Sequence, residues 1–216
     1  LVKLTERSSV TVTEKAEVKA LKDGEASGDI TIKPGESAYF SYQAYEEGRY
    51  TFKGVSDVHV SDVSLSDYDE LEHEADSSYK GFYEVYKIAA DTETILTVSN
   101  TTDKDIKVNV TVSKVVPTEL VLDDPKPITV QKGEAAWVTF KAPLNGVYRY
   151  KFVSGSPEAR INESGAFEKF LQKNVENPKY QNTVTYKVTC ETDKEGVTQA
   201  EAKVLVTVPK AADVKE

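Results

Sequence analysis

Methionine is absent from this sequence of 216 residues, and cysteine and tryptophan occur once each. A single cysteine excludes a disulfide within the chain and any zinc site built from several cysteine thiolates. The only two histidines, His59 and His73, leave little material for histidine-based metal chemistry. Long apolar runs are missing too, and no stretch approaches the roughly 20 apolar residues that a membrane helix requires. The sequence therefore predicts a protein without a membrane span.

Positive charge is also scarce, with 27 lysines and arginines against 36 aspartates and glutamates and a net charge of -9. Because nucleic-acid binding depends on a cationic surface, this balance argues against nucleic acid as a partner. The chain opens at Leu1 with neither methionine nor a signal-like apolar segment, which predicts a segment of a longer product. The one cysteine, Cys190, is expected to be buried and unreactive, with pairing to another chain as the alternative.

What the sequence does contain is an internal repeat. Residues 30–40 align without a gap with residues 128–138, and the match extends to Ser56 and Ser154. Eleven of the 28 positions from Asp29 to Ser56 are identical at this offset of 98 residues. The second halves align more loosely, with the Val-Thr-Val at 110–112 set over the Val-Thr-Val at 206–208.

Two repeats predict two domains. We expect residues 23–116 to form the first domain and residues 128–216 to form the second domain with its tail. Residues 117–127 contain three prolines and are predicted to be a stiff linker, so that the domains lie end to end as a rod. A third Val-Thr-Val stands at 10–12, and Asp23 then falls where Asp123 falls. Residues 1–22 are therefore predicted to be the closing strand and linker of a preceding unit.

Each repeat has the pattern of a series of β-strands. Ala38, Phe40 and Tyr42 share one face by the period of two, and residues 106–112 alternate strictly between apolar and polar. Gly48 and Gly146 stand at equivalent hairpin turns. The predicted fold class is all-β, with two tandem antiparallel β-sandwich domains of jelly-roll or immunoglobulin-like type.

One segment of the second repeat departs from the strand pattern. Residues 164–175 place Phe167, Phe170, Leu171 and Val175 at helical spacing, with Ser164 available as a cap. This spacing predicts a short helix in the second domain.

The first repeat also resembles a known family. A Pro34-Gly35-Glu36 turn follows an apolar strand, and Tyr-Phe, Tyr-Thr-Phe, an acidic stretch from Asp62 and a terminal Val-Thr-Val come after it. This order resembles the bacterial pre-peptidase C-terminal domain, a jelly-roll-like sandwich found beside secreted proteases and other surface proteins. The resemblance covers both repeats, although the second departs after Ser154. It implies a secreted, non-catalytic module; some relatives bind collagen, polysaccharide or calcium, and others are spacers.

No catalytic motif is present in the sequence. There is no Gly-x-Ser-x-Gly elbow, phosphate-binding loop, dinucleotide fingerprint or His-Glu-x-x-His motif. His59 is expected to face solvent from a strand, and His73 is expected in an acidic loop. A domain of this size also has little surface for the cleft that a pair of glycosidase carboxylates requires. We therefore predict that the chain is not an enzyme.

Acidic residues crowd positions 57–76 of the first repeat, and the second repeat lacks such a cluster. Carboxylates are the hard oxygen ligands that calcium prefers, but the spacing does not match an EF-hand loop. Two interpretations stay open, a solvated acidic loop and a calcium site. The candidate calcium ligands are Asp67, Asp69, Glu70, Glu72 and Asp76.

Aromatic side chains offer a possible platform for carbohydrate. Tyr39 and Trp137 occupy equivalent positions on the face of their strands opposite the predicted core, so they are exposed unless a neighbour covers them. Tyr68 adds a third ring, and these three residues are the candidate ligand-binding set. The alternative is that the tyrosines pack at the rim of a sandwich with their hydroxyls in water.

These observations predict a non-catalytic module of a larger secreted or cell-surface bacterial protein, located outside the cell and acting as a spacer or adhesion domain. The alternative is a carbohydrate-binding module attached to an extracellular hydrolase. The expected partners are other domains of the same polypeptide and, for adhesion, a polysaccharide or an extracellular protein. No cofactor is expected other than calcium at the acidic stretch.

Overall fold

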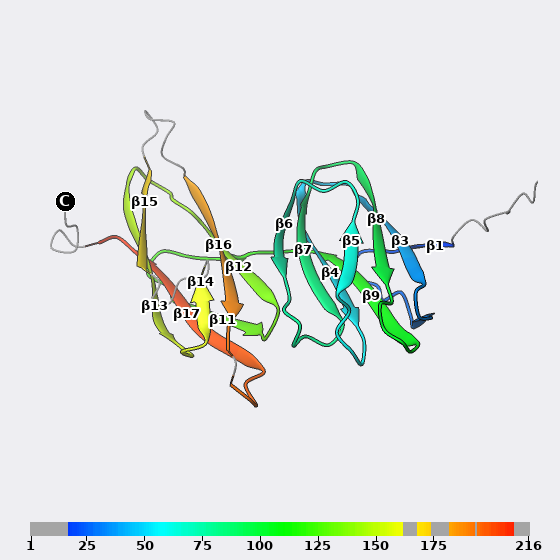
Figure 1. Ribbon diagram of the computed structural model, residues 1–216. Helices are drawn as coiled ribbons and strands as arrows, with labels where there is room; N and C mark the ends of the chain where they lie inside the picture. Colours follow the sequence, from blue (N-terminus) through cyan, green and yellow to red (C-terminus); the bar gives the residue numbers. More distant parts are fainter. Residues whose placement is uncertain (1–16, 162–167, 174–181, 193, 210–216) are drawn as a thin grey trace, which may run out of the picture.

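The computed structural model describes residues 17–161, 168–173, 182–192 and 194–209. All helix or strand structure in these residues is β-strand, which confirms the predicted all-β class. The described strands, β1 to β17, form four sheets (Figure 1). This part of the chain contains no helix with the length and hydropathy that a membrane span needs.

Strands β1 to β9 form two of the sheets, which we call the first sheet pair. One sheet has the order β1-β3-β8-β5 and the other has the order β2-β9-β4-β7-β6. Neighbouring strands are antiparallel, except that β1 runs parallel to β3. The strands are β1 (Val18–Ala20), β2 (Ile30–Ile32), β3 (Ser37–Ala44), β4 (Gly48–Val55), β5 (Asp62–Leu65), β6 (Glu70–Glu74), β7 (Phe82–Ile88), β8 (Thr92–Ser99) and β9 (Ile106–Lys114).

Strands β10 to β17 form the other two sheets, the second sheet pair. Their orders are β10-β12-β16-β14 and β11-β17-β13-β15, so no strand among the described residues corresponds to β6. Again one pairing is parallel, between β10 and β12. The strands are β10 (Thr118–Glu119), β11 (Lys126–Gln131), β12 (Ala135–Lys141), β13 (Gly146–Gly155), β14 (Ala159–Ile161), β15 (Glu168–Lys173), β16 (Thr183–Cys190) and β17 (Gln199–Thr207).

Each sheet pair encloses a hydrophobic core of its own, which is consistent with β-sandwich architecture. In β3, Phe40, Tyr42 and Ala44 are buried in turn, as the period of two predicted. Each of the two cores contains an edge-to-face aromatic contact, and the two contacts stand at equivalent positions of the repeats. Tyr42 meets Phe52 edge to face at 6.0 Å between ring centroids, and Phe140 meets Tyr150 in the same way at 5.8 Å.

The strand registers show how the two repeats correspond. Phe52 pairs with Val112, and its equivalent Tyr150 pairs with Val206. Val112 therefore corresponds to Val206, not to Val208 as the Val-Thr-Val alignment predicted. The error of two residues left the side chains on the correct face, because alternate residues of a strand point the same way.

The predicted helix over residues 164–175 is wrong for the residues that the structure describes. Glu168–Lys173 form strand β15, which pairs antiparallel with β13. The remainder of the predicted helix lies outside the described residues. The helical spacing of the apolar residues was overridden by pairing with another strand, as local propensity routinely is.

The segments predicted to be linkers belong to the sheets. Strand β1 pairs with β3, and Leu21 is buried in the first core. Strand β10 pairs with β12, and Leu120 is buried in the second core. The described part of residues 1–22 is thus built into the first sheet pair rather than standing outside it, and residues 118–127 are built into the second. Residues 1–16 lie outside the described part of the chain.

Candidate functional site

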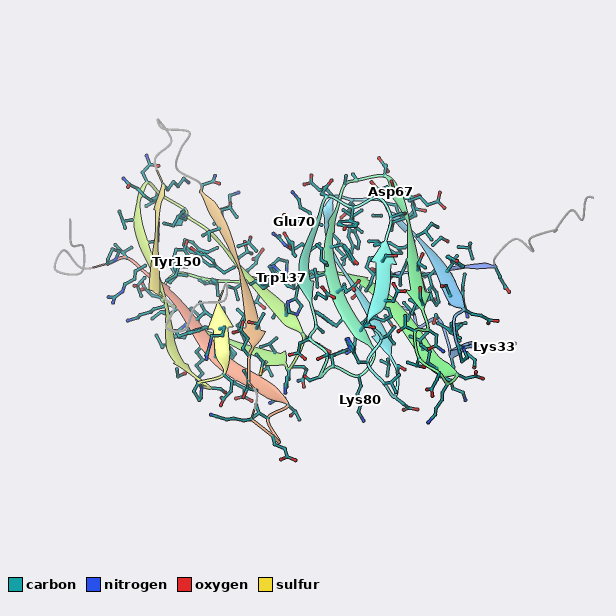
Figure 2. All side chains as sticks on the ribbon, viewed as in Figure 1. Lys33, Asp67, Glu70, Lys80, Trp137 and Tyr150 are labelled. Atoms are coloured by element: carbon teal, nitrogen blue, oxygen red, sulfur yellow. The ribbon has the colours of Figure 1, made fainter. Side chains whose placement is uncertain are left out.

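The two sheet pairs meet across a small hydrophobic cluster, which we call the joint. Tyr83 and Val85 point outward from β7 of the first sheet pair, and Trp137 points outward from β12 of the second. Figure 2 shows Trp137 between the two sheet pairs, and its side chain is 4% exposed. The remaining members of the cluster are Ala75 and the partly buried Tyr79, Val115 and Ala135.

Strand β7 explains how the joint forms. Its residues are buried on both faces, because Phe82, Tyr86 and Ile88 face the first core while Tyr83 and Val85 face the joint. A strand buried on both sides has a near-continuous apolar sequence instead of a clean alternation. The Phe-Tyr-Glu-Val-Tyr run of β7 has this character.

Backbone carbonyls of the second sheet pair accept hydrogen bonds from first-pair side chains. The Tyr83 hydroxyl donates to the Ala135 carbonyl at 3.0 Å, and His73 Nε2 lies 3.0 Å from the Gly133 carbonyl. Because a carbonyl oxygen only accepts, His73 carries a hydrogen on Nε2. These bonds fix the backbone of the turn before β12 against β6 and β7.

Charged groups complete the joint. Glu134 Oε1 accepts from Lys53 Nζ at 2.7 Å and from the Tyr79 hydroxyl at 3.0 Å. In the opposite direction, Lys187 Nζ donates to the Glu72 carbonyl at 2.9 Å.

The turn before β12 requires glycine at position 133. Gly133 has a φ of +81°, and an added Cβ would lie 2.6 Å from the Tyr79 ring. The joint is therefore a specific, directional contact.

Burial controls the ionisation of His73. It lowers the pKa of the imidazole below its ordinary value of 6.5. The hydrogen bond to the Gly133 carbonyl offsets this in part, and the nearby positive charge of Lys187 lowers the pKa further. His73 is therefore neutral in the joint at neutral pH.

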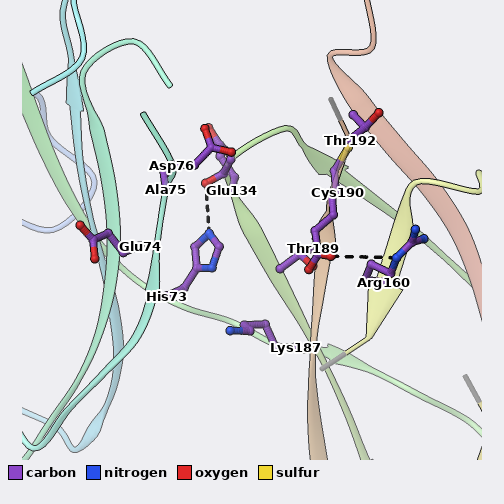
Figure 3. A pocket seen from close by; sticks show the side chains of 12 residues that line it. His73, Glu74, Ala75, Asp76, Glu134, Arg160, Lys187, Thr189, Cys190 and Thr192 are labelled. Carbon is purple, nitrogen blue, oxygen red and sulfur yellow. Dashed lines mark hydrogen bonds and ion pairs between the residues drawn. The ribbon is translucent and has the colours of Figure 1, made fainter. Parts of the chain in front are cut away.

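A cleft of about 490 Å³ opens at the edge of the joint (Figure 3). Both His73 and Cys190 line it, so a cysteine nucleophile must be considered. Burial raises the pKa of the Cys190 thiol, whereas a reactive cysteine needs a lowered one. The imidazole Nε2 already donates to a backbone carbonyl. The cleft therefore lacks the activated thiol that nucleophilic catalysis requires, and the prediction that Cys190 is buried is confirmed.

Tyr39 and Trp137 were expected to be exposed unless a neighbour covers them, and for Trp137 a neighbour does. The first sheet pair covers the indole ring, which leaves no face for a sugar. Tyr39 is partly buried, and Tyr68 is 44% exposed with its ring 4.7 Å from that of Tyr86. The three rings do not form one platform, because Trp137 lies at the joint.

The five candidate calcium ligands are not brought together as a metal site. Asp67, Asp69 and Glu70 are exposed, and Figure 2 shows Asp67 and Glu70 apart. Glu72 is held by Arg49, whose Nη2 lies 2.9 Å from Glu72 Oε1. Asp76 Oδ1 accepts from the Ser78 amide at 2.8 Å, and hydrogen bonding to the Ser78 side chain and then to this amide lowers the pKa of Asp76. Among the described residues, no three His, Cys, Asp or Glu side chains are grouped to hold a metal ion.

Both histidines lie elsewhere than predicted. His73 belongs to strand β6 rather than to a loop, and its ring stacks edge to face on Tyr83. His59 is partly buried, with Nδ1 3.2 Å from the Tyr79 carbonyl. The acidic stretch of the first repeat thus contributes a strand to the joint, and the signal for this was the additional Tyr-rich apolar strand that follows it.

No family model matches this chain, and no curated protein matches it. The resemblance to the pre-peptidase C-terminal domain rests on the sequence motifs.

Proposed function

We propose that the chain is a rigid, non-catalytic spacer within a larger secreted or cell-surface bacterial protein. In this proposal the two sheet pairs are tandem β-sandwich domains of the pre-peptidase C-terminal type, joined as one body. Its partners are then the other domains of the same polypeptide, which it holds apart.

The observation that carries this proposal is the buried Trp137 joint. Domain contacts that are small and polar leave domains free to move, whereas a desolvated aromatic anchor with directional hydrogen bonds restrains them. Trp137 is the desolvated aromatic anchor, and Tyr83 and Glu134 make the directional hydrogen bonds. Strand β1 and the end of β17 also lie at opposite ends of the molecule (Figure 1). A chain that enters at one end and leaves at the other separates whatever precedes it from whatever follows.

An adhesive role receives less support. Trp137, the strongest candidate for stacking on a sugar, is covered, and Tyr68 is left as a single half-exposed ring. We therefore place the spacer role first and treat glycan or collagen binding as an additional property to be measured on the intact chain.

Single-molecule energy transfer between the two ends tests the spacer role. Dyes on Lys33→Cys and Val208→Cys, in a Cys190→Ser background, report the separation of the far ends; both positions are exposed. We expect one narrow population at low transfer efficiency that persists at high salt. A broad distribution in the otherwise unchanged chain would show that the domains move independently, and the spacer proposal would fail.

A further inference from the structure

Within the described part of the chain, the first sheet pair has an uncovered face that corresponds to the face of the second sheet pair in the joint. In the joint, the second sheet pair presents β12 and the turn before it. The equivalent of β12 is β3, at the same offset of 98 residues that relates the two repeats. Strand β3 pairs with β1 and β8 as β12 pairs with β10 and β16.

The groups that make the joint recur on this face. Gly133 accepts from His73 through its carbonyl, Glu134 binds Lys53, and Trp137 fills the centre. Lys187 is the exception. It pairs with Trp137, and the residue that pairs with Tyr39 in the first sheet pair is Thr97. The equivalents of Gly133, Glu134, Ala135 and Trp137 are Gly35, Glu36, Ser37 and Tyr39.

These equivalents are open to a partner. Gly35 and Glu36 are exposed, whereas Gly133 and Glu134 are half-buried, and Tyr39 is less buried than Trp137. A Cβ added at Gly35 would meet nothing within 4 Å, although Gly35 shares the left-handed backbone of Gly133, with φ +74°. The space that the Tyr79 ring fills over Gly133 is therefore vacant over Gly35. A groove of about 380 Å³ lined in part by Glu36, Ser37 and Tyr39 opens beside these residues, where β1, β2 and β3 meet.

The path of the chain at this face also matches the joint. The polypeptide reaches the second sheet pair through β10, parallel to β12, and Leu120 N donates to Thr139 O. It reaches the first sheet pair through β1, parallel to β3, and Leu21 N donates to Ser41 O. A domain joined directly before β1 would therefore lie next to the Tyr39 face.

We propose that the face formed by Gly35, Glu36 and Tyr39 is a second joint, which docks a β-sandwich domain preceding β1 in the polypeptide. The inference rests on the proposed tandem array. The docking domain must present what the first sheet pair presents, namely tyrosine hydroxyls and a lysine, as Tyr79, Tyr83 and Lys53 do. Lysine is the complement of the Glu36 carboxylate.

The second sheet pair of another copy does not meet this requirement. None of its described strands corresponds to β6, and at the register position of Tyr83 its sequence has Glu168. An ionised glutamate only accepts hydrogen bonds, so it cannot replace the Tyr83 hydroxyl that donates to the Ala135 carbonyl in the joint. The fitting partner is a domain of the first kind rather than a second copy of this chain's C-terminal half.

The test is a chain in which a second copy of residues 17–115 is inserted between Val115 and Val116. The inserted copy then offers its Tyr39 face to the original first sheet pair. Spin labels on Lys107→Cys in both copies, with Cys190→Ser, measure the distance across the new joint. Labels on Lys107 and Glu201, which are equivalent by register and both exposed, measure it across the native joint. We expect the two distance distributions to agree in centre and width.

Two substitutions in the inserted copy make the result specific. Gly35→Ala puts a methyl group where the Tyr79 ring of the preceding copy must lie, and we expect the width to at least double. Gly24→Ala is the matched control, because Gly24 has φ +71°, open space around it and bonds to β9 rather than to β3. We expect it to leave the distribution unchanged.

The outcomes separate the two proposals. A broad distribution at the new joint beside a narrow one at the native joint overturns the second joint and leaves the spacer role intact. Broad distributions at both joints overturn both.

If the inserted copy does not fold, the same contact is measured between chains. A Gly35→Ala, Gly133→Val, Trp137→Ala chain, whose Tyr83 face is freed and whose own Tyr39 face is blocked, is mixed with the unchanged chain in sedimentation velocity. We expect a heterodimer that Gly35→Ala in the unchanged partner abolishes. No association at millimolar concentration overturns the proposal.

Discussion

At the scale of single residues, the most instructive difference between the repeats is Tyr150 against Phe52. These rings occupy the same place in the two cores, and both are fully buried. The Tyr150 hydroxyl has no hydrogen-bond partner in the described structure. A buried hydroxyl without a partner costs about 1–3 kcal/mol.

Replacing Tyr150 with phenylalanine should therefore stabilise the protein. The change removes only the unpaired hydroxyl and installs the ring that the first repeat already uses. We expect Tyr150→Phe to raise the free energy of unfolding by about 1 kcal/mol, measured by urea denaturation. A loss of stability would show that the hydroxyl is satisfied in solution.

Glu84 is the second residue that sets the properties of its surroundings. It is 5% exposed on the core side of β7, and the Tyr86 hydroxyl donates to it. Burial raises the pKa of Glu84 from 4.5 to about 7, the Tyr86 hydrogen bond offsets this in part, and Glu74 across the strand pair raises it further. Between pH 4.5 and about 7, Glu84 therefore stays protonated in the folded protein while it is ionised in the unfolded chain.

This pKa predicts how stability depends on pH. Below about pH 4.5 Glu84 is neutral in both states, and its neutral form costs the fold little. As the pH rises from 4.5 to about 7, the unfolded chain loses the proton first, and stability falls by about 3 kcal/mol. Glu84→Gln should remove this loss and should make the protein more stable than wild type at pH 8 but not at pH 4. Parallel stability curves for the two proteins from pH 4 to 8 would contradict the account.

At the scale of elements, alternation predicted the strands well wherever one face is buried and the other is not. Strands β3 and β9 have this pattern, and both form as expected. Strand β15 did not follow from the sequence, because Phe170 and Leu171 also fit a helical stripe. Its structure depends on pairing with β13, from which it is separated by β14, and the residues of β15 carry no local signal of that pairing.

Only part of the joint could be predicted from the sequence. The equivalence of Tyr39 and Trp137 followed from the repeat, but which of them is covered depends on packing between sheet pairs. The acidic stretch at 57–76 left two interpretations open, a solvated loop and a calcium site, because carboxylates are its conspicuous feature. The apolar run of β7, which actually marks a strand buried on both faces, was the more informative signal.

The turn before β12 provides a test at this scale. Gly133→Ala and Gly35→Ala impose the same left-handed backbone strain, about 1 kcal/mol, because φ is +81° and +74°. Only the first also places a methyl group against the Tyr79 ring. In the native chain we expect Gly133→Ala to cost clearly more stability than Gly35→Ala in thermal unfolding. Equal costs would mean that the ring moves aside freely.

At the scale of the whole molecule, we expect the joint to couple the unfolding of the two cores, because its cluster lies between them. Truncating a buried tryptophan typically costs about 3–5 kcal/mol. Here that cost falls on the coupling, because Trp137 belongs to neither core cluster. Trp137→Ala should therefore split one calorimetric transition into two, each with its own melting temperature. A single transition shifted as a whole would place Trp137 within one cooperative core.

The central claim is that the two sheet pairs are held together around Trp137, and the chain's only tryptophan reports on this directly. The decisive measurement is the fluorescence of the folded, unmodified protein under acrylamide quenching. We predict a blue-shifted emission and a quenching constant several-fold below that of the urea-unfolded chain, because the indole is 4% exposed. Red-shifted emission with full access to acrylamide, in a protein whose β-sheet circular dichroism is intact, would show that the sheet pairs are apart and would contradict the account.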